Sequence, residues 1–251
     1  MAEVTDLEEI VKAWAWTSFS KTRGKEYQKL GYNDIKIDIN WSRVRFNSSE
    51  PVYQNKVMQD TQTSKIVFTS TFENNTESEQ EHSFTTERTT TCTATNSVTK
   101  GYTKGFNLEL KLGLPEEVAC ATAGFGRETN VEDVAESTTE QSISWAVDSS
   151  IKVPRMTKTT ASMVVKEKEF TGTFKLDVRI HGTVIVSILN QNDNNSHIHG
   201  VEGSFATIMK NAKGYSGFTI DGKTVIFHVE GKSKFRFGVE QNVRLDEESL
   251  E

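Results

Sequence analysis

The amino-acid sequence predicts a mainly β protein, a sandwich-like body with long polar strands and one short N-terminal helix. Three observations lead to this prediction. Apolar and polar residues alternate along most of the chain, which is typical of half-buried strands. One long segment is rich in Ser and Thr and poor in the large apolar residues of a compact core. Only one stretch, near the N-terminus, has its apolar residues at helical spacing.

The predicted helix spans residues 6 to about 17. Thr5 and Glu8 have the spacing of a capping box, and Leu7, Ile10 and Val11 recur at helical intervals. Beyond this helix the apolar period changes from helical to two. Strands are therefore expected around residues 35–41, 44–46 and 66–72, and no second helix is predicted.

The C-terminal half repeats the period of two. Alternation over residues 174–180 and 184–188 predicts a hairpin that turns at His181-Gly182. The run at 190–195, Asn-Gln-Asn-Asp-Asn-Asn, is a strong strand breaker. Two further strands are expected at 225–229 and 235–239, with a turn near Gly231.

Residues 83–105 form the Ser/Thr-rich segment, in which eleven of the 23 residues are Ser or Thr. Because Thr has high β propensity and the segment contains no Pro, two-sided polar strands fit better than a linker. Residues 127–147 are similarly polar before they alternate at Ile143, Trp145 and Val147. Two polar strands thus flank a central apolar segment.

The central segment, residues 106–125, predicts an amphipathic hairpin. One face of its first arm is apolar and the other is polar: Phe106, Leu108, Leu110, Leu112 and Leu114 against Asn107, Glu109 and Lys111. Nine residues at ~3.3 Å each span ~30 Å, and a membrane-crossing strand needs about 9 to 11 residues. The arm is therefore long enough to cross a bilayer with lipid on one face and water on the other. An ordinary core hairpin is the alternative.

Pro115, Glu116 and Glu117 form the predicted tip, and the return arm from Val118 to Gly126 is uncharged. Its lipid face depends on the number of residues in the tip loop. The two alternatives are Ala119, Ala121, Ala123 and Phe125, or Val118, Cys120, Thr122 and Gly124. The first is favoured because it contains no polar side chain.

An inserted hairpin would leave backbone groups unpaired in hydrocarbon, so only a closed barrel of many hairpins is viable. Insertion therefore demands oligomerisation. In the soluble monomer, the apolar row is expected to be tucked under the body, because an exposed row would aggregate. A conformational switch follows from these two requirements.

The order of segments resembles the pore-forming module of the aerolysin and epsilon-toxin (ETX/MTX2) family over roughly residues 60 to 190. After the Ser/Thr-rich strand and the hairpin come Ile143-Ser144-Trp145, Ile151-Lys152-Val153-Pro154 and Met163-Val164-Val165. The resemblance implies an elongated, mainly β architecture with long twisted strands and a tucked amphipathic hairpin. It also implies a soluble monomer that binds a target membrane, forms a homo-oligomeric ring of about seven subunits and inserts one hairpin per subunit. It places Asn107, Glu109 and Lys111 in the lumen of an ion-conducting barrel.

Three ranges with separate roles are expected. Residues 1–60 would form a membrane- or receptor-binding lobe that contains the helix and shares strands with the rest. Residues 61–190 would form the pore-forming module, and residues 191–251 a β segment that packs on the body.

The candidate membrane or receptor contacts are the aromatic residues Trp14, Trp16, Tyr27 and Tyr32. Their target would be a membrane lipid, a glycan or a protein receptor, and core packing is the alternative. The chain has a net charge of −6, so no nucleic-acid partner is expected. The basic residues Lys21, Arg23, Lys25 and Lys29 either touch acidic lipid or form a solvated face.

Catalytic sequence motifs are absent, so we expect no enzyme, cofactor or metal. His197 and His199, near Asp193, lack an identifiable third metal ligand. Cys92 and Cys120 are expected to be free thiols, and the sequons at Asn47, Asn74 and Asn194 to be chance matches. A non-lytic β-rich binding module, such as a lectin or adhesin, is the alternative function.

The first residues, Met-Ala-Glu-Val-Thr-Asp, lack the pattern of a secretory signal. We therefore expect a secreted or released soluble protein without a recognisable signal peptide, which then acts at a target cell membrane. Storage in the cytoplasm and action in endolysosomal membranes stay open. Host defence and offensive cytolysis are equally compatible with the sequence.

Overall fold

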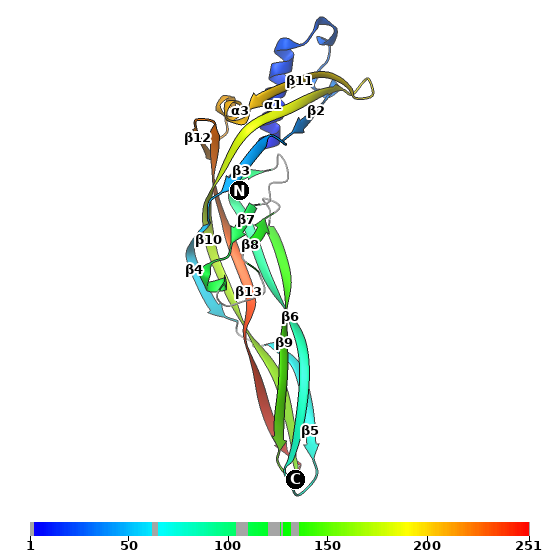
Figure 1. The fold of residues 1–251 in the computed structure, drawn as a ribbon, viewed down its shortest axis with the longest axis vertical. Coiled ribbons are helices and arrows are strands. Elements are labelled where there is room, and N and C mark those ends of the chain that lie inside the picture. Colours follow the sequence, from blue (N-terminus) through cyan, green and yellow to red (C-terminus); the bar gives the residue numbers. More distant parts are fainter. Residues whose placement is uncertain are drawn as a thin grey trace.

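The protein is elongated and mainly β, as the sequence predicts (Figure 1). The structure is a computed structural model and describes residues 3–61, 65–103, 110–119, 126, 128–131 and 136–250. The helices α1 and α3 gather at one end with β2 and β11, here called the head, and the C-terminus lies at the opposite pole.

The elements in chain order are β1 (Glu3–Asp6), α1 (Leu7–Thr22), the 3₁₀ turns η1 (Lys25–Tyr27) and η2 (Tyr32–Asp34), β2 (Ile35–Asn40), β3 (Val44–Ser48), β4 (Val52–Asp60), β5 (Lys65–Asn74), β6 (Gln80–Thr103), β7 (Leu110–Gly113), α2 (Glu116–Ala119), β8 (Glu128–Val131), β9 (Glu136–Val153), β10 (Thr157–Asn190), β11 (Ser196–Ser204), α3 (Phe205–Asn211), β12 (Phe218–Asp221) and β13 (Thr224–Ser249).

Strand β10 is the spine of the molecule, because it runs from the far pole into the head. One edge of β10 pairs antiparallel with β13 over Thr157–His181. Its other edge pairs in succession with β5, β4 and β3. Beyond Gly182 it pairs with β11 and β2. The predicted ranges 1–60, 61–190 and 191–251 therefore share one sheet, and their separate roles stay a prediction.

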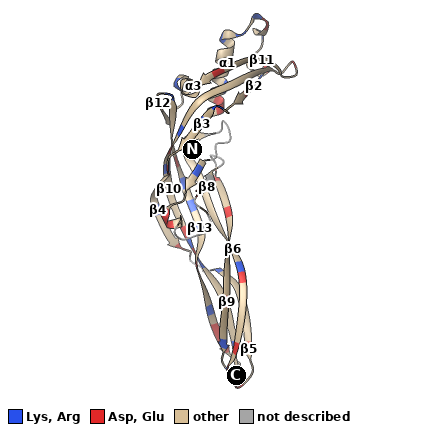
Figure 2. Ribbon diagram, viewed as in Figure 1, with Lys and Arg blue, Asp and Glu red and all other residues tan. Residues whose placement is uncertain are grey.

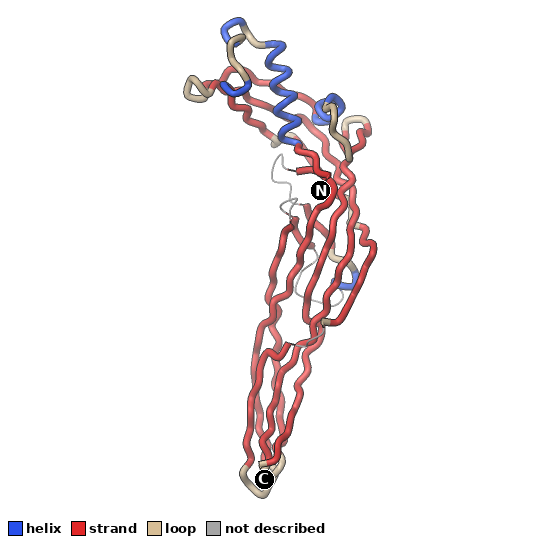
Figure 3. Tube along the Cα trace, turned by 180° about the vertical axis from the view of Figure 1, so that it is seen from behind, coloured by secondary structure: helices blue, strands red, loops and turns tan. Residues whose placement is uncertain are grey.

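The narrow half away from the head consists of strands joined by turns at the pole (Figure 3). The two long polar strands predicted from the Ser/Thr-rich segments are β6 and β9, which pair antiparallel from Gln80–Val153 to Ser97–Glu136. Their inner face packs on the sheet formed by β5, β10 and β13. Near the pole this core contains Ile151, Val153 and Ala161.

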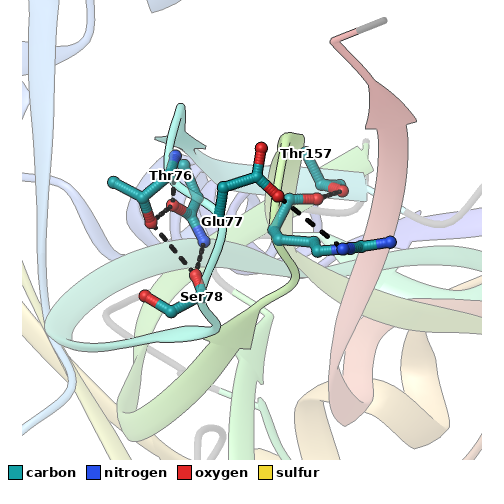
Figure 4. Close-up of polar contacts among 6 residues, drawn as sticks. Thr76, Glu77, Ser78 and Thr157 are labelled. Carbon is teal, nitrogen blue, oxygen red and sulfur yellow. Dashed lines mark hydrogen bonds and ion pairs between the residues drawn. The ribbon is translucent and has the colours of Figure 1, made fainter.

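At the pole, the side chain of Asn74 joins the turn between β5 and β6 to the turn between β9 and β10. Its side chain is fully buried. The amide nitrogen donates to the carbonyls of residues 153 and 154 at 3.1 and 3.0 Å, and the amide oxygen accepts the N–H of Thr76 at 3.0 Å. Glu77 forms an ion pair with Arg155 beside it, at 3.7 Å (Figure 4). The sequon at Asn74 is thus not an exposed acceptor in the folded chain.

The N-terminal helix extends to Thr22, further than predicted, and its cap differs from the prediction. Asp6 is the N-cap, and its carboxylate accepts the N–H of Glu9 at 3.0 Å. Thr5 belongs to β1, and its hydroxyl donates to the carbonyl of Ser216. Glu8 forms an ion pair with Lys12 instead of reaching back to the cap.

The turns predicted at Gly182 and Gly231 are wrong, because both glycines lie within continuous strands. At Gly182, where φ is +127°, a Cβ would lie 2.2 Å from the carbonyl oxygen of Arg43. Here β10 leaves β3 and β13 and joins β2 and β11. At Gly231 a Cβ would lie 2.3 Å from Cζ of Phe174. These glycines permit close approach of neighbouring groups.

A second helix, α3, also departs from the prediction. Its apolar residues Phe205, Ala206, Ile208 and Met209 are buried in the main core of the head end, beside Phe174 and Phe227. Their spacing of one, three and four residues is helical. This helix is only about two turns long and follows β11 directly. Its apolar pattern is therefore too short to predict a helix from the sequence.

Candidate functional site: the segment between β6 and β9

The predicted hairpin lies between the two long polar strands, and the structure describes its middle. Leu110, Lys111, Leu112 and Leu114 of the first arm, the tip residues Pro115 to Glu117, and Ala119 are described. The remaining predicted positions lie outside the described residues: Phe106, Asn107, Leu108, Glu109, Ala121, Ala123 and Phe125.

The described part of the first arm has the predicted two faces. Leu112 is fully buried and Leu110 and Leu114 are half-buried, whereas Lys111 is exposed. The partner of β7 is β8, with Leu110 opposite Val131. Val131 and Leu112 both belong to the main core. The apolar side of this arm is therefore tucked against the body, as expected of a soluble monomer.

Strand β8 is anchored to the body by a buried polar network. The side-chain amide of Asn96 in β6 donates to the hydroxyl of Thr129 at 3.1 Å. Its amide oxygen accepts the hydroxyl of Ser233 in β13 at 2.6 Å. All three side chains are buried, so a break in this network leaves a polar group unsatisfied, at a cost of about 1–3 kcal/mol.

The tip forms the helical turn α2 in this structure. The carbonyl of Pro115 accepts the N–H groups of Val118 and Ala119 at 3.0 and 2.9 Å. Val118 is fully buried and packs on a cluster that includes Phe170 and Phe235. The predicted return arm begins at Val118, but in this structure Val118 and Ala119 are helical and β8 pairs with β7. Proline at the start of a helical turn favours this local conformation.

Two side chains of β4 hold the tip segment in place. The hydroxyl of Tyr53 donates to the carbonyl of Gly113 at 3.0 Å, and burial raises the pKa of Tyr53 to about 12. Lys56 forms an ion pair with Glu117 at 3.0 Å. A backbone N–H at Glu117 and the Lys56 ammonium hold the pKa of the Glu117 carboxyl below its ordinary value. Sequence reasoning missed Tyr53 and Lys56 as contacts, because no local pattern marks them.

The outer face of β6 and β9 is lined with hydroxyl groups. Even-numbered residues of β6 from Thr90 to Val98 are buried, so the odd-numbered Thr91, Thr93, Thr95 and Ser97 face outward. Across the ladder, the hydroxyls of Thr95 and Thr138 lie 3.0 Å apart. The Ser/Thr-rich pattern therefore marks a hydrated face with few large apolar side chains.

Three of the four aromatic contact candidates lie together on the head, and the fourth lies apart from them. Trp14 packs toward β11, where a Cβ on Gly203 would lie 2.6 Å from its ring. Trp16 meets Tyr32 edge-on at 5.5 Å, and Tyr27 packs around the same cluster. Tyr32 is 47% exposed. The structure thus brings Trp16, Tyr27 and Tyr32 together and leaves Trp14 elsewhere.

A groove of about 620 Å³ runs between α1 and β2. Tyr32 and Trp41 supply aromatic surface, and Asp38 and Gln191 supply polar groups. The described residues contain no group of three or more His, Cys, Asp or Glu side chains placed to hold a metal ion. None of the described helices combines the length and the apolar character that a membrane-spanning helix needs.

The fold and the tucked amphipathic segment define an aerolysin-like β protein. A family model described as Clostridium epsilon toxin ETX/Bacillus mosquitocidal toxin MTX2 matches residues 33–251. The chain belongs to this family of pore-forming toxins.

Two solved structures illustrate the likeness. A non-toxic crystal protein from Bacillus thuringiensis has a TM-score of 0.57 and 16% identity, over 99% of this chain and 98% of its own. The β-pore-forming protein Mpp75Aa1.1 from Brevibacillus laterosporus has a TM-score of 0.46 and 16% identity, over 92% of this chain and 82% of its own. At such identities the first shows the shared fold alone. A search of curated proteins gave no match.

Proposed function

We propose that this protein permeabilises a target membrane without enzymatic chemistry. The soluble monomer binds a membrane lipid, glycan or protein receptor, assembles into a ring, and inserts residues 106–125 of each subunit into a shared transmembrane β-barrel. The observation that carries this proposal is the register between β6 and β9, the two strands that flank the segment.

In every pair of the β6–β9 ladder the two residue numbers add to 233, from Gln80–Val153 to Ser97–Glu136. If the ladder continues with this register, the two strands meet at Glu116 and Glu117. The tip is then a two-residue turn, the commonest length for a hairpin. A register set by the body of the protein thus agrees with the tip predicted from the pattern of the segment itself.

The same register favours one lipid face for the return arm. It sets Leu108, Leu110, Leu112 and Leu114 opposite Phe125, Ala123, Ala121 and Ala119. Directly opposite residues point to the same side of an antiparallel pair. The leucine row and the Ala/Phe row then form one apolar surface toward lipid.

The other face would line the pore. In the inserted hairpin, Asn107, Glu109 and Lys111 would continue the odd-numbered outer face of β6, which carries hydroxyl groups. The barrel would therefore have a hydrated lumen both inside and outside the bilayer. A ring of about seven subunits, as the family resemblance implies, gives about fourteen strands, close to sizes that leave an aqueous channel.

Insertion requires the tucked state to come apart. Strand β7 must leave β8, and residues 118 and 119 must change from helix to strand. The β7–β8 pairing, the pairing of β1 with the end of β6 and the Asn96–Thr129 hydrogen bond must be lost. The burial of Val118 and Leu112 and the bonds from Tyr53 and Lys56 are lost as well. They are few compared with the β10–β13 ladder, so this segment can open while the body stays folded.

Dye release from liposomes made with a whole-cell lipid extract tests the proposal. Leu110 lies at the middle of the first arm and is only half-buried in the monomer. Leu110→Asp places a charge at the bilayer centre, at roughly 2.5–3.5 kcal/mol per subunit, and is expected to abolish release. Leu112 is unsuitable because it is fully buried in the monomer.

The matched control is Leu245→Asp, because Leu245 is 45% exposed and lies on β13 near the pole. This variant is expected to release dye at the wild-type rate. Equal release by the folded Leu110→Asp variant would contradict the proposal.

The second candidate function is a non-lytic binding module, which the groove between α1 and β2 favours. Replacement of residues 106–125 by a short turn separates the two functions. If the pore proposal is right, this variant still binds the target membrane and no longer permeabilises it. If wild type binds without ever permeabilising, the binding-module function gains support.

A further inference from the structure

The exposed end of the head carries a local basic patch, defined here as Lys21, Arg23, Lys25 and Lys29. With Glu26, this nine-residue stretch has a net charge of +3 in a chain of net charge −6. Figure 2 shows blue segments around the end of α1, at one extremity of the long molecule. The patch therefore faces outward where a large planar surface can approach.

The three lysines of this patch are exposed, and none of them forms an ion pair with another described residue. Many lysines of the body do form ion pairs, such as Lys166 with Glu240 and Lys234 with Glu169. The charge of the basic patch is thus not neutralised within the described part of the chain.

Two acidic residues, Glu26 and Asp34, lie close to the patch in the sequence, and Asp34 is held by hydrogen bonds. Asp34 accepts hydrogen bonds from the N–H of Gly31 and from the side chain of Asn192, at 2.8 and 3.1 Å. The carboxylate of Glu26 lies against Gly24. Neither forms a salt bridge with the three lysines. The field of the patch stays positive toward solvent.

Arg23 ties the patch to the aromatic cluster. Its guanidinium donates to the carbonyl of Leu30 at 2.7 Å and lies 5.6 Å from the ring centre of Trp16. Trp16 in turn meets the exposed ring of Tyr32. Basic side chains beside amphipathic aromatic rings are typical of segments that rest at a membrane interface.

We propose that the basic patch binds the surface of bilayers that contain acidic phospholipids. This deepens the proposed function, because it names the lipid class that the head would meet first. Each basic residue near an acidic surface contributes about fivefold to binding. The aromatic rings favour a bilayer over a soluble polyanion, since they gain from contact with the headgroup region and not from charge alone.

Sedimentation with phosphatidylcholine vesicles, with and without phosphatidylserine, tests this inference. Wild type is expected to prefer the acidic vesicles and to lose that preference at high salt. The triple variant Lys21→Gln, Lys25→Gln, Lys29→Gln is expected to bind acidic vesicles on the order of 100-fold more weakly.

The matched control changes three exposed lysines on another side of the head: Lys210→Gln, Lys213→Gln and Lys223→Gln. This control variant lowers the net charge by the same three units as the patch variant. It is expected to retain at least a tenth of wild-type binding to acidic vesicles. Equal loss in both variants, no preference for acidic vesicles, or retention on heparin without vesicle binding would overturn the inference. The readout is binding alone, so a protein that binds but releases no dye contradicts the pore proposal and leaves this inference standing.

Discussion

The burial of Val118 offers a direct way to loosen the tucked segment. Val118 is fully buried and packs on the cluster that contains Cys92, Phe170 and Phe237. Val118→Ala removes two carbon atoms at about 0.8 kcal/mol each and leaves a small cavity, for a total of about 2 kcal/mol. The loss weakens the docking of α2 on the body.

If the segment opens before the whole protein unfolds, about 2 kcal/mol raises its open population about 30-fold. Hydrogen exchange of the Val118 and Ala119 amides, which bond to the carbonyl of Pro115, measures that opening. Dye release, measured at equal amounts of bound protein, is expected to become faster by up to the same factor. The matched control is Val57→Ala, at a valine that is 52% exposed on β4.

Two outcomes would refute this reasoning. Unchanged amide exchange would show that Val118 does not anchor the segment. Faster exchange with an unchanged release rate would show that undocking of the segment does not limit insertion.

Three further predictions concern the tip, the body and the proposed lumen. Because the pKa of Glu117 is lowered in the tucked state, the ion pair with Lys56 is intact at neutral pH and is lost as the pH falls through that lowered pKa. Dye release should therefore stay constant from neutral pH down to the ordinary pKa of a glutamate side chain and rise only below it, and Glu117→Gln should remove this rise. Gly231→Ala should lower the free energy of unfolding, measured in urea, by about 1–3 kcal/mol, because the added Cβ would overlap the ring of Phe174. Gly200→Ala should leave it unchanged, because a Cβ there would lie 3.9 Å from its nearest neighbour. Glu109→Gln and Lys111→Gln should shift the reversal potential of the pore in opposite directions; an unchanged potential in both would exclude them from the lumen.

The sequence predicts several of the strands because they depend on local periodicity. Alternation at Ile35, Ile37 and Ile39 marks β2, and the Ser/Thr-rich stretches mark β6 and β9. The two-faced pattern around Leu112 agrees with the burial of its apolar side. These features need no knowledge of distant contacts.

The departures arise where one residue type serves two purposes. Glycine permits both turns and close contacts between neighbouring groups. Gly231 serves a close contact, because the ring of Phe174 leaves no room for a Cβ there. The helical state of Val118 depends on a pocket built from β6, β10 and β13, which no local pattern reveals. The contacts from Tyr53 and Lys56 join residues about sixty positions apart.

The most direct test of the pore proposal uses a thiol of the chain itself. In the proposed inserted hairpin, the register of β6 and β9 would set Cys120 opposite Gly113, on the lumen face. A tip loop with an odd number of residues would instead turn Cys120 toward lipid. Cys120 lies outside the described residues. Single-channel recording in planar bilayers, with a charged methanethiosulfonate reagent added to the aqueous phase, distinguishes these arrangements. We predict stepwise currents that fall on labelling of wild type and not of Cys120→Ser; steps that labelling leaves unchanged in wild type, or the absence of steps, would contradict the account.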